Sequence, residues 1–182
     1  MIDLPTLKGL RVTLRRPQKE DADVRFSLGR HPEIAEMFGV SREHLTALTR
    51  SEADSWVSDL QSHPYAWAIE FESLIGSIRL DRVDLRDQRA SLAIGILSPA
   101  FLGKGLGTES NILVLDFGFN VLRLHRVSVR VLAYNERAIR CYQKCGFIIE
   151  GRERETAFVN GKWHDDIMMG LLSREFRGSS RN

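Results

Sequence analysis

The sequence predicts a mixed α/β fold, with helices packed on a mostly antiparallel sheet of about seven strands. Segments with strand-like alternation occur both before and after apolar segments with helical spacing. Three strand candidates in the middle of the chain are joined by short polar turns, which favours an antiparallel meander. The last two strands flank an Asn-Gly pair, a strong signal for a two-residue hairpin.

The chain has 182 residues, which suits one domain with one core. We therefore expect residues 1–176 to form a single domain. The last six residues, RGSSRN, are small and polar. Residues 177–182 are predicted to be a disordered tail.

The first third of the chain predicts one strand followed by broken helices. Residues 10–14 alternate between apolar and basic side chains, as a half-buried strand does. Pro17 then opens a helical stretch, because proline is favoured in a first helical turn. Residues 31–62 are mostly helical but interrupted, and Ser51 is the expected cap of their last helix.

The rest of the chain predicts strands and helices in alternation. After the meander come a glycine-rich turn, a buried helix, a strand, a short helix and the final hairpin. The expected ranges are strands at 65–71, 74–83 and 89–97, a helix at 108–122, a strand at 127–131, a helix at 135–145, and hairpin strands at 147–159 and 163–172.

The composition excludes several classes of protein. The chain has 26 basic and 24 acidic residues and no basic block, so we expect no nucleic-acid partner. No apolar run approaches the roughly 20 residues that span a bilayer, so no membrane partner is expected. The N-terminal residues lack the apolar core of a signal peptide, and a cytoplasmic location is expected. The five histidines are scattered without the spacing of metal ligands, so no metal is expected.

The segment from Leu102 to Thr108, LGKGLGT, lies between a strand and the buried helix. Its three alternate glycines leave the backbone accessible, and the N–H groups at a helix start favour an anion such as a pyrophosphate. Lys104 could add a charge and Thr108 a hydroxyl. A Walker loop is excluded because Gly105, and not Ser or Thr, follows the lysine. The glycine spacing excludes a dinucleotide fingerprint. The alternative is a glycine turn without a ligand.

The segment NERAIRCYQKCGF, residues 135–147, directly follows a strand. On a helix, Asn135, Ala138, Ile139 and Tyr142 share one face, so an amide and a phenol could line one wall of a cleft. The alternative is a helix packed on the sheet, with Asn135 as its N-cap and Tyr142 as a half-buried side chain.

In this order and spacing, the two segments resemble the GNAT superfamily of acyl-CoA N-acyltransferases, and above all its ribosomal-protein N-terminal and spermidine acetyltransferase branch. The resemblance covers about residues 8–172 and includes FVNGKW in the hairpin. It implies a sheet that splays open between the strands ending at Leu97 and Leu132, with helices on both faces. Leu102 stands where the family motif begins with Gln or Arg, a departure expected to weaken the cofactor site.

The resemblance further implies acetyl-CoA as the co-substrate. Its pantetheine arm would pair with the backbone near Ile96 and Leu97 and touch Asn135. Tyr142 would donate a proton to the departing thiolate. The turn residues implied to bind the cofactor are Leu102, Gly103, Lys104, Gly105, Leu106, Gly107 and Thr108.

The implied reaction is direct attack of a primary amine on acetyl-CoA in a ternary complex. The acceptor would be a small molecule, a polyamine or a protein N-terminus, chosen by residues 31–62 and the final hairpin. A homodimer is also expected, because dimers are common in this branch. The alternative is a non-catalytic acyl-CoA-binding sensor or regulatory module.

An alkyl amine with a pKa of about 10 is almost wholly protonated at pH 7, so the reaction needs a base. The strand RASLAIGIL contains no acid. As a metal site, the triplet His164-Asp165-Asp166 is set aside, because adjacent strand residues alternate faces and cannot all converge. The remaining candidates, each expected rather to be a solvated charge, are Glu70, Asp81, Asp84 and Glu136.

Overall fold

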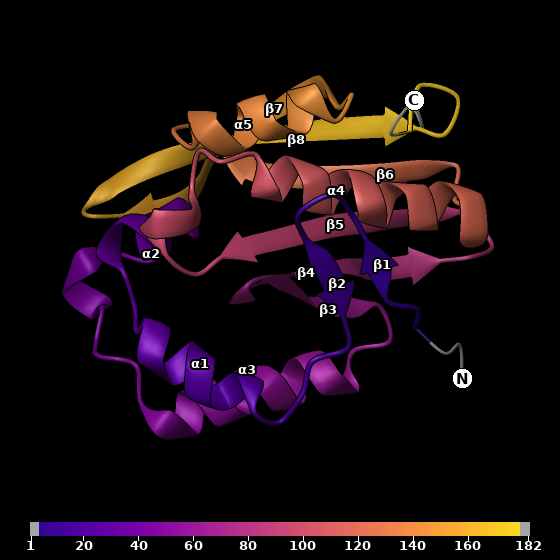
Figure 1. Cartoon of the computed structure of the whole chain (residues 1–182). Coiled ribbons are helices and arrows are strands. Elements are labelled where there is room, and N and C mark those ends of the chain that lie inside the picture. Colours follow the sequence, from indigo (N-terminus) through magenta and orange to yellow (C-terminus); the bar gives the residue numbers. More distant parts are fainter. Residues whose placement is uncertain (1–3, 179–182) are drawn as a thin grey trace.

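A computed structural model describes residues 4–178 of the chain, arranged around one eight-stranded sheet (Figure 1). The strand order is β1-β2-β3-β4-β5-β6-β8-β7, and all neighbours are antiparallel except β5 and β6. This confirms the predicted mixed, mostly antiparallel sheet. The strands are β1 (Leu7–Lys8), β2 (Thr13–Arg15), β3 (Ala66–Phe71), β4 (Ser73–Asp84), β5 (Arg89–Ile96), β6 (Arg126–Leu132), β7 (Ile148–Val159) and β8 (Lys162–Leu172).

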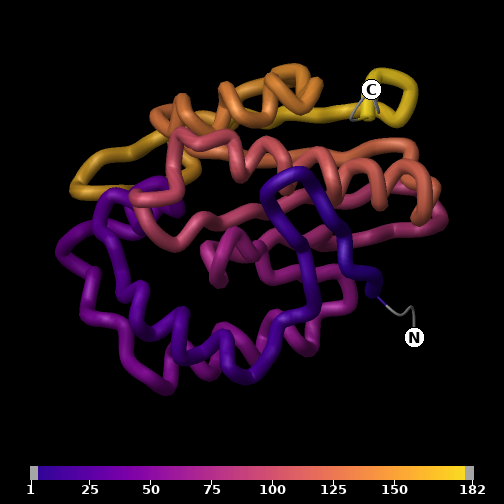
Figure 2. The backbone as a smooth tube through the Cα atoms, viewed as in Figure 1, coloured from indigo at the N-terminus to yellow at the C-terminus, as the bar shows by residue number. Residues whose placement is uncertain are grey.

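The eighth strand arises where the sequence predicted one strand over residues 10–14. The N–H of Gly9 donates to the carbonyl of Val12 at 2.9 Å, which closes a turn between β1 and β2. Leu10 lies in this turn and is 98% exposed. The apolar alternation therefore continues across a turn, so the prediction of a single strand was wrong. The hairpin crosses beside the beginning of α4 (Leu106–Asp116) (Figure 2).

Helices cover both faces of the sheet (Figure 1). α4 packs on one face, where Phe117 at its end meets Trp67 of β3 edge-on at 5.3 Å. α1 (Asp21–Leu28) contacts β4 and α3 (Arg50–Ser62) contacts β3. Four successive residues of β3, Ala66–Ile69, are buried although neighbouring side chains point to opposite faces, as a strand covered on both sides requires.

The other helices are α2 (Pro32–Met37), α5 (Glu136–Lys144), and short 3₁₀ turns at Arg42–His44 and Pro99–Phe101. α4 begins two residues before the predicted start and continues into a π-helical turn, Phe117–Val121. No helix within residues 4–178 combines the length and apolar character needed to cross a bilayer.

The predicted cap of α3 was wrong, because Thr49 and not Ser51 occupies that position. The Thr49 hydroxyl accepts from the Glu52 N–H, and the Glu52 carboxylate accepts from the Thr49 N–H at 2.8 Å. This reciprocal capping box satisfies two backbone groups that Ser51, already inside the helix, could not.

The hairpin of β7 and β8 is as predicted. Asn160 (φ 50°) and Gly161 (φ 75°) both have the positive φ that its two-residue turn requires. The tip is bound to the segment after α2: the Asn160 N–H donates to the Ser41 hydroxyl and its side-chain oxygen accepts from the Arg42 N–H, each at 2.9 Å. Of the tail predicted at residues 177–182, residues 179–182 lie outside the described residues.

Candidate active site

The central sheet opens between its two parallel strands. β5 and β6 pair only over residues 89–91 and 126–128. At the last paired position, the hydroxyl oxygens of Ser91 and Ser128 are 3.2 Å apart. Beyond them β5 continues to Ile96 and β6 to Leu132 without pairing to each other. The splayed sheet predicted from the sequence is therefore present.

Backbone groups of β5 face this opening. The N–H of Leu97 donates to the carbonyl of Ile75 on the β4 side at 2.9 Å. Since backbone groups of a strand alternate between its two neighbours, the N–H and C=O groups of Ile94 and Ile96 point toward β6. Ile96 thus offers the unpaired backbone that the sequence led us to expect, whereas the Leu97 N–H is used within the sheet.

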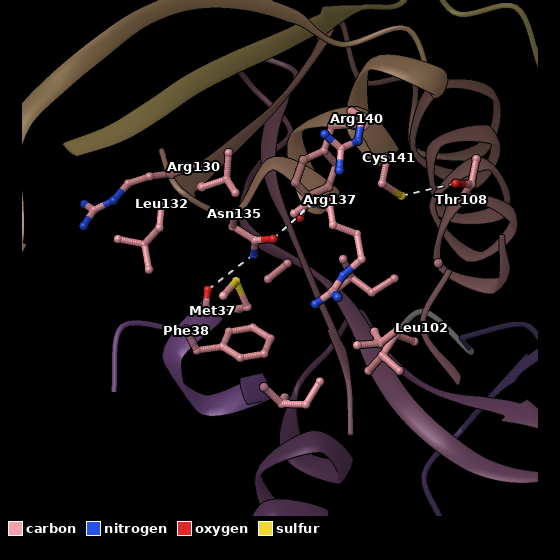
Figure 3. A pocket seen from close by; sticks show the side chains of 18 of the residues that line it. Met37, Phe38, Leu102, Thr108, Arg130, Leu132, Asn135, Arg137, Arg140 and Cys141 are labelled. Carbon is pink, nitrogen blue, oxygen red and sulfur yellow. Dashed lines mark hydrogen bonds between the residues drawn. The ribbon is translucent and has the colours of Figure 1, made fainter. Parts of the chain in front are cut away.

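A cavity of about 890 Å³ fills the opening (Figure 3). It is walled by the open ends of β5 and β6, the glycine turn with the start of α4, one face of α5, and the segment at the end of α2. Nine of the predicted site residues line it, and Leu97 and Lys104 do not. The nine are Ile96, Leu102, Gly103, Gly105, Leu106, Gly107, Thr108, Asn135 and Tyr142.

The glycine turn presents the first turn of α4 to the cavity. Gly103 (φ 72°) and Gly105 (φ 78°) adopt the left-handed conformation that disfavours other residues. The Glu109 N–H is bonded to Gly105 O, so the three preceding N–H groups, of residues 106–108, lack intrahelical partners. A Cβ on Gly107 would lie 3.8 Å from Ile94 Cδ1 and 3.9 Å from Cys141 Sγ. Free N–H groups at a helix N-terminus are an arrangement that favours a bound anion.

The β1–β2 hairpin holds this turn in place. The Arg11 guanidinium donates to the carbonyl of Lys104 at 2.8 Å and forms an ion pair with Glu109. The Glu109 carboxylate also accepts the backbone N–H groups of Arg11 and Val12. Burial raises the pKa of Glu109, but these hydrogen bonds outweigh it and hold the pKa below its usual value.

Asn135 caps α5 in the way the alternative interpretation expected. Its side-chain oxygen accepts the Ala138 N–H at 3.2 Å, and its amide nitrogen lies 3.5 Å from the Met37 carbonyl (Figure 3). Tyr142 is only 7% exposed and packs edge-on against Phe147. Burial is the largest cause that raises the pKa of the Tyr142 phenol, and the charges of the nearby cysteines raise it further. The phenol therefore keeps its proton at neutral pH.

Cys141 joins α5 to α4 beside the glycine turn (Figure 3). Its sulfur lies 3.2 Å from the Thr108 hydroxyl and 3.5 Å from the Asn111 amide nitrogen. Hydrogen bonding with Cys145 is the largest cause that lowers the pKa of Cys141 below its usual value. The pKa of Cys145 is raised by the same contact and by burial.

Three cations on α5 also line the cavity, and we did not single them out from the sequence. They are Arg137, Arg140 and Lys144. Figure 3 shows Arg137 reaching across the cavity toward Phe38 and Leu102. Their spacing of three and four residues places them on one helix face, a signal available in the sequence. They add positive charge beside the anion site.

The comparisons with known proteins fit this geometry. Residues 11–148 match the family model of the acetyltransferase (GNAT) domain. The chain belongs to the GNAT acetyltransferase family.

Named relatives of this GNAT domain are bacterial acetyltransferases. The chain is 36% identical over 101 residues to spermidine N(1)-acetyltransferase of Escherichia coli, a match that covers 56% of the chain and 54% of that enzyme. The match thus spans about half the length of this relative. The chain is also 27% identical over 180 residues to the N-acetyltransferase p20 of Bacillus licheniformis, and this match covers 96% of the chain and 100% of that protein.

The fold also matches solved structures. One is the spermidine N-acetyltransferase of Vibrio cholerae in complex with CoA and spermine, with a TM-score of 0.76. That match covers 92% of the chain and 98% of the enzyme at 24% sequence identity, which shows a common fold.

The four acids considered as bases lie elsewhere in this GNAT domain. Glu70 pairs with Arg15, Asp81 with Arg79 and His63, and Glu136 with Arg140. Asp84 accepts two backbone N–H groups of the turn after β4. None of the four lines the main cavity, although Glu136 borders a smaller pocket of about 300 Å³ beside it.

A different acid, Asp166, lines the cavity. It is 3% exposed, lies 2.6 Å from Arg130 Nε and accepts the Thr156 hydroxyl at 2.7 Å. The members of the triplet His164-Asp165-Asp166 diverge as strand alternation predicts, because Asp165 pairs with Arg152 instead. Asp166 enters the cavity without Asp165. Among residues 4–178 no three His, Cys, Asp or Glu side chains gather as a metal site would need.

Proposed function

We propose that the protein is an acetyl-CoA-dependent N-acetyltransferase that acylates a primary amine by direct attack. The observation that carries this proposal is the cavity itself. It fills the gap between β5 and β6, begins at an unpartnered helix N-terminus and is walled by cations of α5. Family membership and the names of the relatives support the same reaction.

The residues present fit acetyl-CoA. The N–H groups of residues 106–108 would hold the diphosphate, with Arg137 and Arg140 supplying positive charge. The free backbone of Ile94 and Ile96 would pair with the amides of the pantetheine arm. A side chain at Gly107 would fill this cradle, which its lack of a Cβ keeps open. Leu102 lines the cavity without a charge, and the α5 cations offset the departure from the family motif.

Acetyl-CoA supplies a thioester carbonyl as the electrophile. Tyr142 holds its proton inside the cavity and would give it to the sulfur that leaves. The raised pKa of Tyr142 keeps the phenol protonated before the reaction. Asn135 orients the first turn of α5 and thereby the wall that carries Tyr142.

A polyamine is the acceptor that the named relatives favour. Glu33 borders the smaller pocket, together with Tyr134 and Glu136. Glu36, in contrast, is bound by Arg42 and Asn160. A second amine of a polyamine would therefore rest near Glu33.

We propose further that the chain forms a homodimer through β7, the last strand of the sheet. Ile148, Ile149 and Phe158 of this strand are about half exposed. Light scattering on a sizing column tests this, with Ile149→Lys expected to yield monomers.

The reaction is tested by measuring thiol release from acetyl-CoA with a panel of amines, and by mass spectrometry of the products. We expect turnover with one or more primary amines, spermidine included. Tight binding of acetyl-CoA without turnover on any amine would instead favour a cofactor-binding sensor. Absence of heat in calorimetry with millimolar CoA would contradict both.

A further inference from the structure

The two faces of the sheet contribute different walls to the cavity. Ile94 lies on the face that carries α4, because its Cδ1 is 3.8 Å from the position of a Cβ on Gly107. The next residue, Gly95, points the other way and would meet Phe38, just after α2, at 3.3 Å. The cavity therefore passes through the opened sheet, from the glycine turn on one face to α2 on the other.

Asp166 belongs to the α2 side of this passage. It pairs with Leu132 of β6, and directly paired residues of neighbouring strands share a face. Leu132 Cδ1 lies 3.7 Å from the position of a Cβ on Gly39, which places both residues beside the end of α2. The acetyl donor would enter from the glycine turn, so the α2 side is left for the acceptor.

The surroundings of Asp166 hold its carboxylate in a fixed position. The closest contact of Arg130 and the hydrogen bond from Thr156 both fall on the same oxygen, Oδ2. Arg130 is half exposed, whereas the side chain of Asp166 is 4% exposed. Because both partners contact Oδ2, the other carboxylate oxygen, Oδ1, can accept a hydrogen bond from a donor in the cavity.

Other charged groups near Asp166 come from each neighbouring element. Glu153 of β7 is its direct partner in the strand register. His164 lies two residues earlier on β8 and packs edge-on against Tyr134. Beyond Tyr134, α2 contributes Glu36, which is bound to Arg42. Of the charged groups around Asp166, Arg130 lines the cavity together with Asp166 itself.

We propose that Asp166 receives the acceptor nitrogen and takes its proton during acyl transfer. This rests on the function proposed above. Oδ1 of Asp166 takes one proton from the bound ammonium and passes it to water, which frees the lone pair of the nitrogen. That lone pair forms the new N–C bond while the C–S bond breaks and its electron pair leaves with sulfur. The nitrogen then loses a second proton through Oδ1 of Asp166 to water. One proton passes from Tyr142 to sulfur, and Tyr142 is reprotonated from water.

The test compares Asp166→Asn with Asp165→Asn, the same change one residue away on the opposite face. Steady-state rates with the best amine, calorimetry with acetyl-CoA and melting temperatures are measured for each. For Asp166→Asn we expect kcat/KM for the amine to fall about 100-fold or more, as loss of a proton acceptor does. Affinity for acetyl-CoA should stay within about twofold of wild type, and Asp165→Asn should keep wild-type kcat/KM.

A pH profile separates proton transfer from a structural role. Without the carboxylate the reaction depends on the amine that is already neutral, so the Asp166→Asn rate should rise about tenfold per pH unit below the amine pKa. Asp166→Glu should recover part of the activity. A second variant, Thr156→Val, keeps the carboxylate but loses its orienting hydrogen bond and should reduce kcat/KM about tenfold.

Two results would overturn the proposal: wild-type kcat/KM in folded Asp166→Asn, or a loss that is constant with pH and equal to that of Asp165→Asn. If Asp166→Asn does not fold, an unchanged kcat/KM in Thr156→Val overturns it. Failure of the wild-type protein to release thiol with any amine would instead contradict the proposed function itself.

Discussion

The hydroxyl oxygens of Ser91 and Ser128 lie 3.2 Å apart where the two parallel strands part. Ser128 also approaches the Ala90 carbonyl at 3.4 Å, and Ser91 accepts from Arg82. These contacts fix the closed end of the opening. Everything beyond them, from the free backbone of Ile94 to the first turn of α4, depends on where the strands separate.

Gly107→Ala should affect the stability of the protein and its affinity for acetyl-CoA in different ways. Gly107 lies inside α4, where alanine is favoured over glycine by about 1 kcal/mol, and the new methyl would meet its neighbours at ordinary contact distances. We expect unfolding by urea to show equal or higher stability, while the affinity for acetyl-CoA falls about tenfold. Gly103→Ala is the matched control.

In Gly103→Ala the methyl meets no atom within 4 Å, but φ is 72°. This variant should lose about 1 kcal/mol of stability from strain. Tighter acetyl-CoA binding by Gly107→Ala would show that the cradle is not where the cofactor lies.

Tyr142→Phe removes the proposed proton donor but keeps the ring that packs on Phe147. We expect kcat to fall about 100-fold while the acetyl-CoA affinity stays within about twofold. Because burial raises the pKa of the phenol, the wild-type enzyme should retain activity above pH 10, where an exposed tyrosine would lose its proton. Unchanged turnover in the variant would remove this role.

Cys141 should be the reactive thiol of the protein. Its pKa is lowered, which favours the thiolate, whereas Cys145 has a raised pKa and is 6% exposed. We expect iodoacetamide to label Cys141 first, and at a lower pH than an unperturbed thiol would react. Acetyl-CoA should protect it, because Cys141 lines the cavity. Peptide mass spectrometry measures both effects, and earlier labelling of Cys145 would contradict the assignment.

Glu109 should make the free energy of unfolding depend on pH in the acidic range. Its folded-state pKa is lowered, so its contribution is complete above the unfolded value of 4.5 and is lost as pH falls through the folded pKa. Glu109→Gln should destabilise the protein by about 1–3 kcal/mol at pH 7 and flatten the decline below pH 4.5. Urea unfolding at pH 7 and below measures this, with the exposed Glu20→Gln as control. Equal acid slopes in wild type and Glu109→Gln would contradict the prediction.

Local patterns in the sequence were enough for much of the fold and for the glycine turn that lines the cavity. The Asn160-Gly161 turn and the glycines at 103 and 105 are decided by backbone conformation, which short motifs encode directly. The cap of α3 was mistaken because Thr49 and Ser51 have the same chemistry, and only the reach of Glu52 distinguishes them.

The acceptor side of the site could not be predicted in this way. Asp166 enters the cavity because of its register against Leu132 and because α2 lies opposite, two facts set by segments over 30 residues distant. Arg137 differs from Asp166 in this respect, because its spacing to Arg140 and Lys144 on one helix face is a local pattern of the sequence.

The attachment of Asn160 to Ser41 and Arg42 has an evolutionary consequence. Two stretches more than a hundred residues apart enclose the acceptor side, and they meet at the hairpin tip. A chimaera that imports one stretch from a relative would break the hydrogen bonds with the other. Diversification toward new amines should therefore proceed by paired substitutions, and residues 36–42 and 156–166 should covary among homologues.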